Sequence, residues 1–99
     1  MVLEIADFRI KAGTEDDFAA AVKEALPFIS ATPGFLSARL TRGVESPSRF
    51  VLLIEWESVE AHNKGFRESD RFPKWRALIG PYFDGDPYVE HAADVLRSS

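Results

Sequence analysis

Residues 49–57 of the chain read RFVLLIEWE. Apolar side chains fill almost every position, and β-branched and aromatic residues favour a strand over a helix. A strand that is apolar on both of its faces has to be covered on both. This stretch therefore predicts the central strand of a sheet, and the rest of the chain must supply its neighbours and its covers.

Three further segments are predicted to be strands of the same sheet. Residues 35–44 precede the central strand and are separated from it by the polar turn 45–48, so the two are predicted to form a hairpin. Residues 2–11 carry apolar positions among scattered charges, and residues 88–96 follow the turn-forming sequence Asp-Gly-Asp-Pro. Both are interpreted as strands.

The intervening segments are predicted to be helices. Residues 14–29 begin with Thr14 as an N-cap, followed by three acidic residues where the helix dipole favours negative charge. Two shorter helices are expected after Ser58 and after residues 69–70. Helical spacing predicts these inward-facing side chains for the two short helices: Val59, His62, Asn63, Phe66, Phe72, Trp75, Arg76 and Ile79.

The resulting order, β-α-β-β-α-(α)-β, predicts a ferredoxin-like α+β fold. It consists of a split βαβ arrangement with a four-stranded antiparallel sheet and helices on one face, in one domain over residues 1–99. The other face is left open although the central strand is apolar on both sides. A second copy of the sheet is the simplest cover, which predicts a homodimer in the form of a dimeric α/β barrel. The alternative is a monomer with an ordinary exposed apolar patch.

Composition excludes several classes of function. Net charge is −4 and no basic stretch could follow a nucleic-acid backbone, so no nucleic-acid partner is expected. The absence of cysteine excludes disulfides and thiolate chemistry. No apolar run approaches the roughly 20 residues of a membrane span, and the beginning of the chain does not look like a signal peptide. We therefore expect no membrane association and a cytoplasmic location.

Three motifs carry a family resemblance. PGFLSA at residues 33–38 opens the second strand, EWES at 55–58 ends the third and is followed by Ala61-His62, and PYVEH at 87–91 lies in the last strand. Together with the element order, they resemble the antibiotic biosynthesis monooxygenase family over nearly the whole chain. The family includes cofactor-free oxygenases of aromatic polyketides, haem-degrading enzymes, small isomerases and proteins of no known role.

The resemblance implies a specific site. In the cofactor-free oxygenases of the family, which oxidise a phenol to a quinone with molecular oxygen, a tryptophan, a phenylalanine and an arginine correspond to Trp56, Phe66 and Arg76. Two positions depart: Leu52 replaces a site asparagine, and His62 replaces a tyrosine. No cofactor is implied.

The haem-degrading branch matches less well. The places of its asparagine, tryptophan and iron-binding histidine hold Ala6, Phe66 and Arg76. Without a histidine at the ligand position, haem degradation is not expected.

The residues themselves suggest roles for three side chains. His62 has an ordinary pKa suited to a general base near neutrality, or it bonds a backbone carbonyl at the helix edge. Arg76, on an apolar stripe, would need a partner: a substrate oxyanion, or one of the glutamates 55, 57 and 90. Trp56 is either a site residue or core, and its indole N–H needs an acceptor.

Other side chains are weaker candidates. Trp75, Tyr82 and Phe66 would line a flat aromatic pocket or simply belong to the core, and Leu52 would lie beside them. His91 would look into the pocket or lie at a dimer seam. Two histidines without a carboxylate at ligand spacing make a poor metal site, so no metal is expected.

Three functions remain open. The first is a cofactor-independent monooxygenase of a small aromatic or polyketide-like phenol, with Trp56, His62 and Arg76 at its centre. The second is a proton-transfer enzyme of the cyclase or isomerase type. The third is a non-catalytic domain, whose pocket would be filled by its own side chains; a cavity of several hundred cubic ångströms would argue against it.

Overall fold

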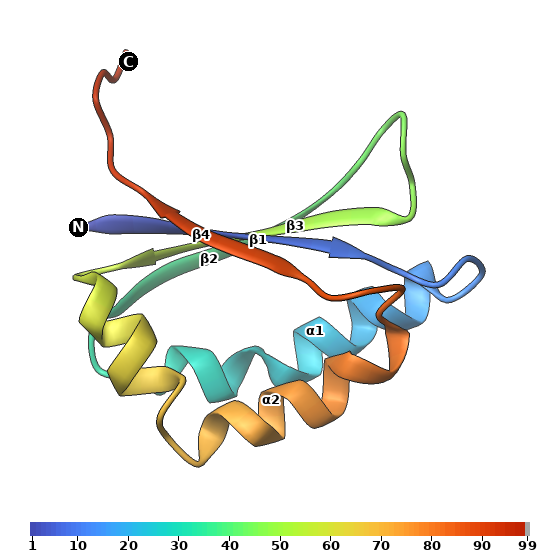
Figure 1. Cartoon of the computed structure of the whole chain (residues 1–99), viewed down its shortest axis with the longest axis horizontal. Coiled ribbons are helices and arrows are strands. Elements are labelled where there is room, and N and C mark those ends of the chain that lie inside the picture. The colour runs from blue at the N-terminus through green and yellow to red at the C-terminus, as the bar shows by residue number, and fades with distance from the viewer. Residues whose placement is uncertain (99) are drawn as a thin grey trace.

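A computed structural model describes residues 1–98 of the chain. Its elements in chain order are β1 (Val2–Arg9), α1 (Glu15–Ser30), β2 (Phe35–Arg42), β3 (Arg49–Trp56), η1 (Ala61–Phe66), α2 (Arg71–Ile79), η2 (Gly80–Tyr82) and β4 (Tyr88–Ala92). The strands form an antiparallel sheet in the order β2-β3-β1-β4, and α1 and α2 cover one face of it (Figure 1). This is the ferredoxin-like α+β fold that the element order predicts.

The pleat of the two central strands divides the apolar residues between the two faces of the sheet. Phe8 pairs with Phe50 and Ala6 with Leu52, and these four side chains are buried under the helices. Phe18 of α1 packs edge-on against the rings of both phenylalanines, at 5.5 Å and 5.0 Å between ring centroids. The core therefore lies between the sheet and its helices.

No element within residues 1–98 covers the other face of the sheet (Figure 1). Leu3 and Ile5 of β1 and Val51 and Leu53 of β3 form an apolar stripe there and are only half-buried. The side chains of β3 are thus buried on the helix side and only half-buried on the other side, so the second cover that its apolar run predicts is not supplied by residues 1–98.

The last strand is shorter than predicted. It ends at Ala92 rather than at residue 96, because Ala92 pairs with Leu3 and β1 begins one residue earlier, at Val2. Val95 and Leu96 therefore have no strand to pair with, and their side chains are 100 % and 91 % exposed.

The first short helix also differs from the prediction. Residues 61–66 form a π-helix, in which the N–H of Arg67 donates to the carbonyl of His62 at 2.9 Å. Its wider turn buries His62 and Phe66 and leaves Asn63 exposed, so the placement of Asn63 on the inner face was wrong. π-Helical turns are rare and occur often at functional sites. In residues 1–98 no helix is both long enough and apolar enough to cross a membrane.

Candidate functional site

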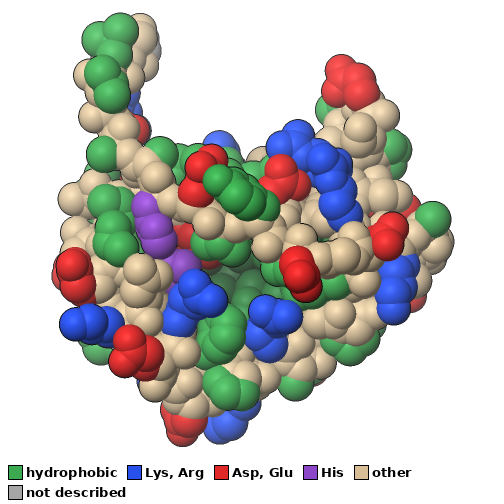
Figure 2. Space-filling view, viewed as in Figure 1, with side chains coloured by type: hydrophobic (Ala, Val, Ile, Leu, Met, Phe, Trp, Pro, Cys, Tyr) green, Lys and Arg blue, Asp and Glu red, His purple; other side chains and the backbone are tan. Residues whose placement is uncertain are grey.

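A cavity of about 410 Å³ lies between the helix-facing side of the sheet and the two short helices. Its walls come from β1, β3, η1, α2, the loop before β4 and the start of β4, with one residue of α1, and its floor is largely apolar. Figure 2 shows it as a hollow with hydrophobic side chains inside, basic side chains at the rim and histidine beside it. Its volume is in the range of small-molecule sites.

A glutamate forms one end of this cavity. Glu4 of β1 points to the helix-facing side of the sheet, and its side chain is only 7 % exposed. Trp56 Nε1 donates a hydrogen bond to Glu4 Oε1 at 2.9 Å. Burial raises the pKa of Glu4 from 4.5 to about 7, against smaller opposing effects of the Trp56 hydrogen bond and the charge of Arg67. Such a carboxylate is suited to accept and return protons near neutrality.

His62 lies next to Glu4. Its Nε2 is 3.3 Å from Glu4 Oε1, and its ring stacks on Trp56 at 5.3 Å between centroids. Burial, followed by the nearby charges of His91 and Arg67, lowers the pKa of His62 from 6.5 to about 4. His62 is therefore neutral at pH 7, so the ion pair with Glu4 is at most transient.

The π-helix that carries His62 is fixed by several contacts. Ser58 Oγ accepts a hydrogen bond from the N–H of Ala61, the first residue of the π-helix, at 3.1 Å. Gly34, at φ +94°, packs so tightly against Ala61 that a Cβ added to it would lie 2.6 Å from Ala61 Cβ. Arg71 bonds both Thr32 Oγ1 and the carbonyl of Gly65 at 3.1 Å. These contacts hold the imidazole against the sheet.

Two arginines at the cavity have no carboxylate partner within residues 1–98. Arg76 is exposed and its guanidinium lies 5.3 Å from the centre of the Phe83 ring. Arg67 lies in the same way over Phe72, at 5.5 Å. Of the two partners considered for Arg76, a glutamate of the fold is not found within residues 1–98, because the guanidinium is exposed at the cavity mouth.

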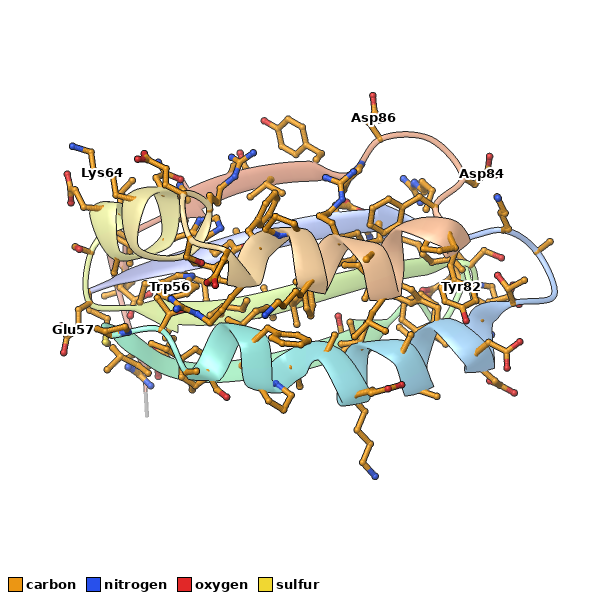
Figure 3. The ribbon with its side chains drawn as sticks, turned by 90° about the horizontal axis from the view of Figure 1, so that it is seen from below. Trp56, Glu57, Lys64, Tyr82, Asp84 and Asp86 are labelled. Carbon is orange, nitrogen blue, oxygen red and sulfur yellow. The ribbon has the colours of Figure 1, made fainter. Side chains whose placement is uncertain are left out.

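The structure brings most of the predicted site residues together, but not all of them. Trp56 and His91 lie behind His62 rather than in the cavity wall, and His62 Nδ1 is 2.8 Å from His91 Nε2. Tyr82 is not part of the wall; it packs against Phe18. Figure 3 shows Tyr82 and Trp56 toward opposite ends of the molecule. The predicted residues that line the cavity are Leu52, His62, Phe66, Trp75 and Arg76.

Sequence reasoning missed Glu4 and Arg67. The signal for Glu4 was present: it occupies the same alternating positions as Ala6, Phe8 and Ile10, which are all buried. An acidic residue in phase with a core face is unusual and suggests a function. Arg67 follows the π-helix, whose wider turn the helical spacing did not predict.

No metal centre is formed by the part of the chain that the structure describes, residues 1–98. Nowhere in it do three histidine, aspartate or glutamate side chains gather in a way that could hold a metal ion. The side chains at the cavity supply a carboxyl, an imidazole, guanidinium groups and aromatic walls.

The sequence and the fold of the chain are similar to those of known proteins. A sequence model described as antibiotic biosynthesis monooxygenase matches residues 1–78. The uncharacterized protein YczJ of Bacillus subtilis (strain 168) is 39 % identical over 95 residues, covering 96 % of this chain and all of that protein. A Bordetella bronchiseptica crystal structure assigned as an antibiotic biosynthesis monooxygenase is 38 % identical, with a TM-score of 0.93, and the match covers 96 % of this chain and 97 % of that one.

A more distant match concerns the fold alone. SnoaB from Streptomyces nogalater, a cofactor-independent oxygenase, is 17 % identical with a TM-score of 0.75. That match covers 99 % of this chain and 94 % of that one.

Proposed function

The chain belongs to the antibiotic biosynthesis monooxygenase family, and we propose that it oxidises a small aromatic or polyketide-like phenol with molecular oxygen and no cofactor. The observation that carries the proposal is Glu4, a carboxyl of pKa about 7 at the end of an aromatic-lined cavity. Cofactor-free oxygenation requires a base that makes the substrate electron-rich and a dry site that holds the resulting anion.

The chemistry balances without an external reductant. Glu4 takes a proton from an activated C–H of the phenol, which leaves a carbanion delocalised into the ring. The anion transfers an electron to O₂, and recombination forms a C–O bond to a peroxide. Protonation and loss of water then leave a C=O group, so that one oxygen atom enters the product and the other leaves as water.

The arginines suit the charge that this reaction develops. Arg67 and Arg76 both line the cavity, and the guanidinium of each lies over one phenylalanine ring. Neither has a carboxylate partner in the described residues. A guanidinium can donate two parallel hydrogen bonds to an oxyanion. We assign to Arg76 the stabilisation of the phenolate oxygen and to Arg67 a supporting role.

Oxygen uptake tests the proposal directly. With an anthrone as substrate, whose activated CH₂ carbon becomes the new C=O group, the protein should consume one O₂ for each quinone formed, and Glu4→Gln should slow turnover by about 10²–10⁴-fold, as expected for loss of a general base. Lys74→Gln, an exposed change on α2 outside the cavity, is the matched control. No uptake across a broad panel of phenols would contradict it.

A second function is proton transfer without oxygen, as in a cyclase or isomerase. It is favoured by Leu52, an apolar side chain in the cavity wall where an oxygen-holding amide would be expected, and by a carboxyl that needs no oxidant to act. Turnover that continues under strictly anaerobic conditions would identify this function. The open cavity argues against a purely structural domain.

We also propose that the protein is a homodimer. The stripe of Leu3, Ile5, Val51 and Leu53 lies on the uncovered face of the sheet, and on the same face Arg49 pairs with Asp7 at 2.7 Å. An apolar centre with a charged rim is typical of subunit interfaces.

A further inference from the structure

Glu4 is the inner end of a line of groups that runs away from the cavity. His62 Nε2 lies 3.3 Å from Glu4 Oε1, and on the other side of the same ring His62 Nδ1 lies 2.8 Å from His91 Nε2. Glu4 and His91 lie side by side on the sheet, because β4 pairs with β1 and places His91 directly opposite Glu4. It begins at a buried carboxyl and ends on an edge strand.

The geometry of the rings keeps this line in place. Trp56 stacks on His62 at an interplanar angle of 20° and bonds Glu4 at the same time, so it fixes both groups. The His91 ring meets His62 edge-on, with 5.0 Å between centroids. His62 is buried and His91 is half-buried, which is the order expected for a path from inside to outside.

From this geometry we infer that Glu4, His62 and His91 form a proton relay, with His91 as the positioning residue through which Glu4 exchanges its proton with solvent. The inference rests on the proposed function only for its use in turnover, since the path itself can be observed without a substrate.

Proton accounting defines two states of the relay. In the first, Glu4 is a carboxylate, and both histidines carry their proton on Nε2. The Nε2–H of His62 then points to Glu4, and the Nε2–H of His91 donates to His62 Nδ1. In the second, Glu4 is protonated, and both histidines carry their proton on Nδ1. A proton that arrives at His91 Nδ1 pushes the Nε2 proton of His91 to His62 Nδ1, and the Nε2 proton of His62 to Glu4. Each ring gains one proton and loses one.

This scheme does not require a charged His62. The groups that face the Glu4–His62 pair are Trp56 from β3, His91 from β4 and Arg67 after the π-helix. Burial, His91 and Arg67 hold the pKa of His62 near 4, so its imidazole exchanges protons rather than storing one. The 3.3 Å separation between His62 Nε2 and Glu4 Oε1 closes to the usual hydrogen-bond length with a shift of a few tenths of an ångström in the His62 side chain.

Nitrogen NMR of ¹⁵N-histidine-labelled protein tests the relay without a substrate. As the pH falls through about 7, where Glu4 takes up its proton, both histidines should change together from the Nε2–H to the Nδ1–H form. Glu4→Gln should abolish the change in both rings. Glu90→Gln, on the opposite face of β4, is the control and should leave it intact. A fixed tautomer in the unmodified protein, or a change that persists in Glu4→Gln, would overturn the relay.

Turnover separates the relay from the proposed function. His91→Gln should slow oxidation by about a hundredfold, the lower end for a positioned proton-transfer group, and added imidazole should restore part of the rate. Coupled tautomers without any oxidation would support the relay and refute the proposed function. Oxidation at full rate in His91→Gln, with fixed tautomers, would refute the relay alone.

Discussion

Trp56 and Glu4 are joined across neighbouring strands by a hydrogen bond of 2.9 Å from the indole Nε1 to the carboxyl Oε1. The pair lies in the buried layer beneath the π-helix, with Trp56 fully buried. The indole N–H donates to one oxygen of a buried carboxyl, but this hydrogen bond does not offset the desolvation that raises the pKa of Glu4. This imbalance has measurable consequences.

Stability should depend on pH through Glu4. Because its pKa is about 7 in the fold and near 4.5 in the unfolded chain, the folded state binds more protons between these values. The contribution of Glu4 to the free energy of unfolding is therefore fully present below pH 4.5. It is lost as the pH rises through 7, which lowers that free energy by about 3 kcal/mol.

Relative to the parent, the free energy of unfolding of Glu4→Gln should increase by that amount between pH 4.5 and 7 in urea unfolding. Glu24→Gln, exposed on α1, controls for the lost charge; a pH-independent difference would contradict the assignment.

His62 should act in the opposite direction. Its pKa is about 4 in the fold and near 6.5 in the unfolded chain, so the unfolded state binds more protons between these values. Its contribution is present above pH 6.5 and is lost as the pH falls through 4, by about 3 kcal/mol. In His62→Gln this acid-side loss should disappear, and the stability of the variant should fall with rising pH through Glu4 alone. Equal pH profiles for variant and parent would show that His62 is not held neutral.

Arg76→Gln should affect turnover and leave stability unchanged. The side chain is exposed and its contact within the fold is the face of Phe83, so we expect the free energy of unfolding to change by at most about 1 kcal/mol. Loss of a donor to the developing oxyanion should reduce kcat by about 10²-fold or more. Steady-state oxygen uptake measures this, with Lys74→Gln as control; a change in KM alone would indicate substrate binding without stabilisation of the transition state.

Gly34 and Gly13 separate crowding from backbone strain. Both have positive φ, +94° and +90°, but a Cβ at Gly34 meets Ala61 Cβ at 2.6 Å, whereas at Gly13 nothing lies within 4 Å. Gly13→Ala should cost about 1–2 kcal/mol from strain alone. Gly34→Ala should cost about 1–3 kcal/mol more, since the π-helix must move. Thermal unfolding measures both, and equal losses would show that the contact with Ala61 is unimportant.

The open sheet face should control the oligomeric state. Leu53→Lys places a charge in the centre of the apolar stripe, and the proposed dimer should dissociate to monomers in sedimentation analysis. Ala20→Lys, on the exposed face of α1, should leave the mass unchanged. A parent protein that is monomeric at all concentrations would refute the homodimer.

Much of the fold could be predicted from local patterns. The apolar run of β3, the turn at residues 45–48 and the helical stripe after Thr14 indicate the elements and their order. The order in turn leads to the sheet topology, because ferredoxin-like connections permit few alternatives. The end of β4 was not predictable in this way, since it depends on where β1 begins.

Part of the site could also be predicted from local patterns. The sequence by itself determined that four side chains face inward, because burial of apolar stripes follows the helix and strand periods. These are His62, Phe66, Leu52 and Trp75.

Only the tertiary structure decided that Glu4 meets His62, Trp56 and His91, since these contacts depend on strand register and on the π-turn. The same is true of Arg76, which helical spacing placed on the inner stripe and which the packing of α2 directs to the cavity mouth instead. Periodicity sets the face on which a side chain lies; the long-range packing of the chain sets its neighbours, and the neighbours set its pKa and its chemistry.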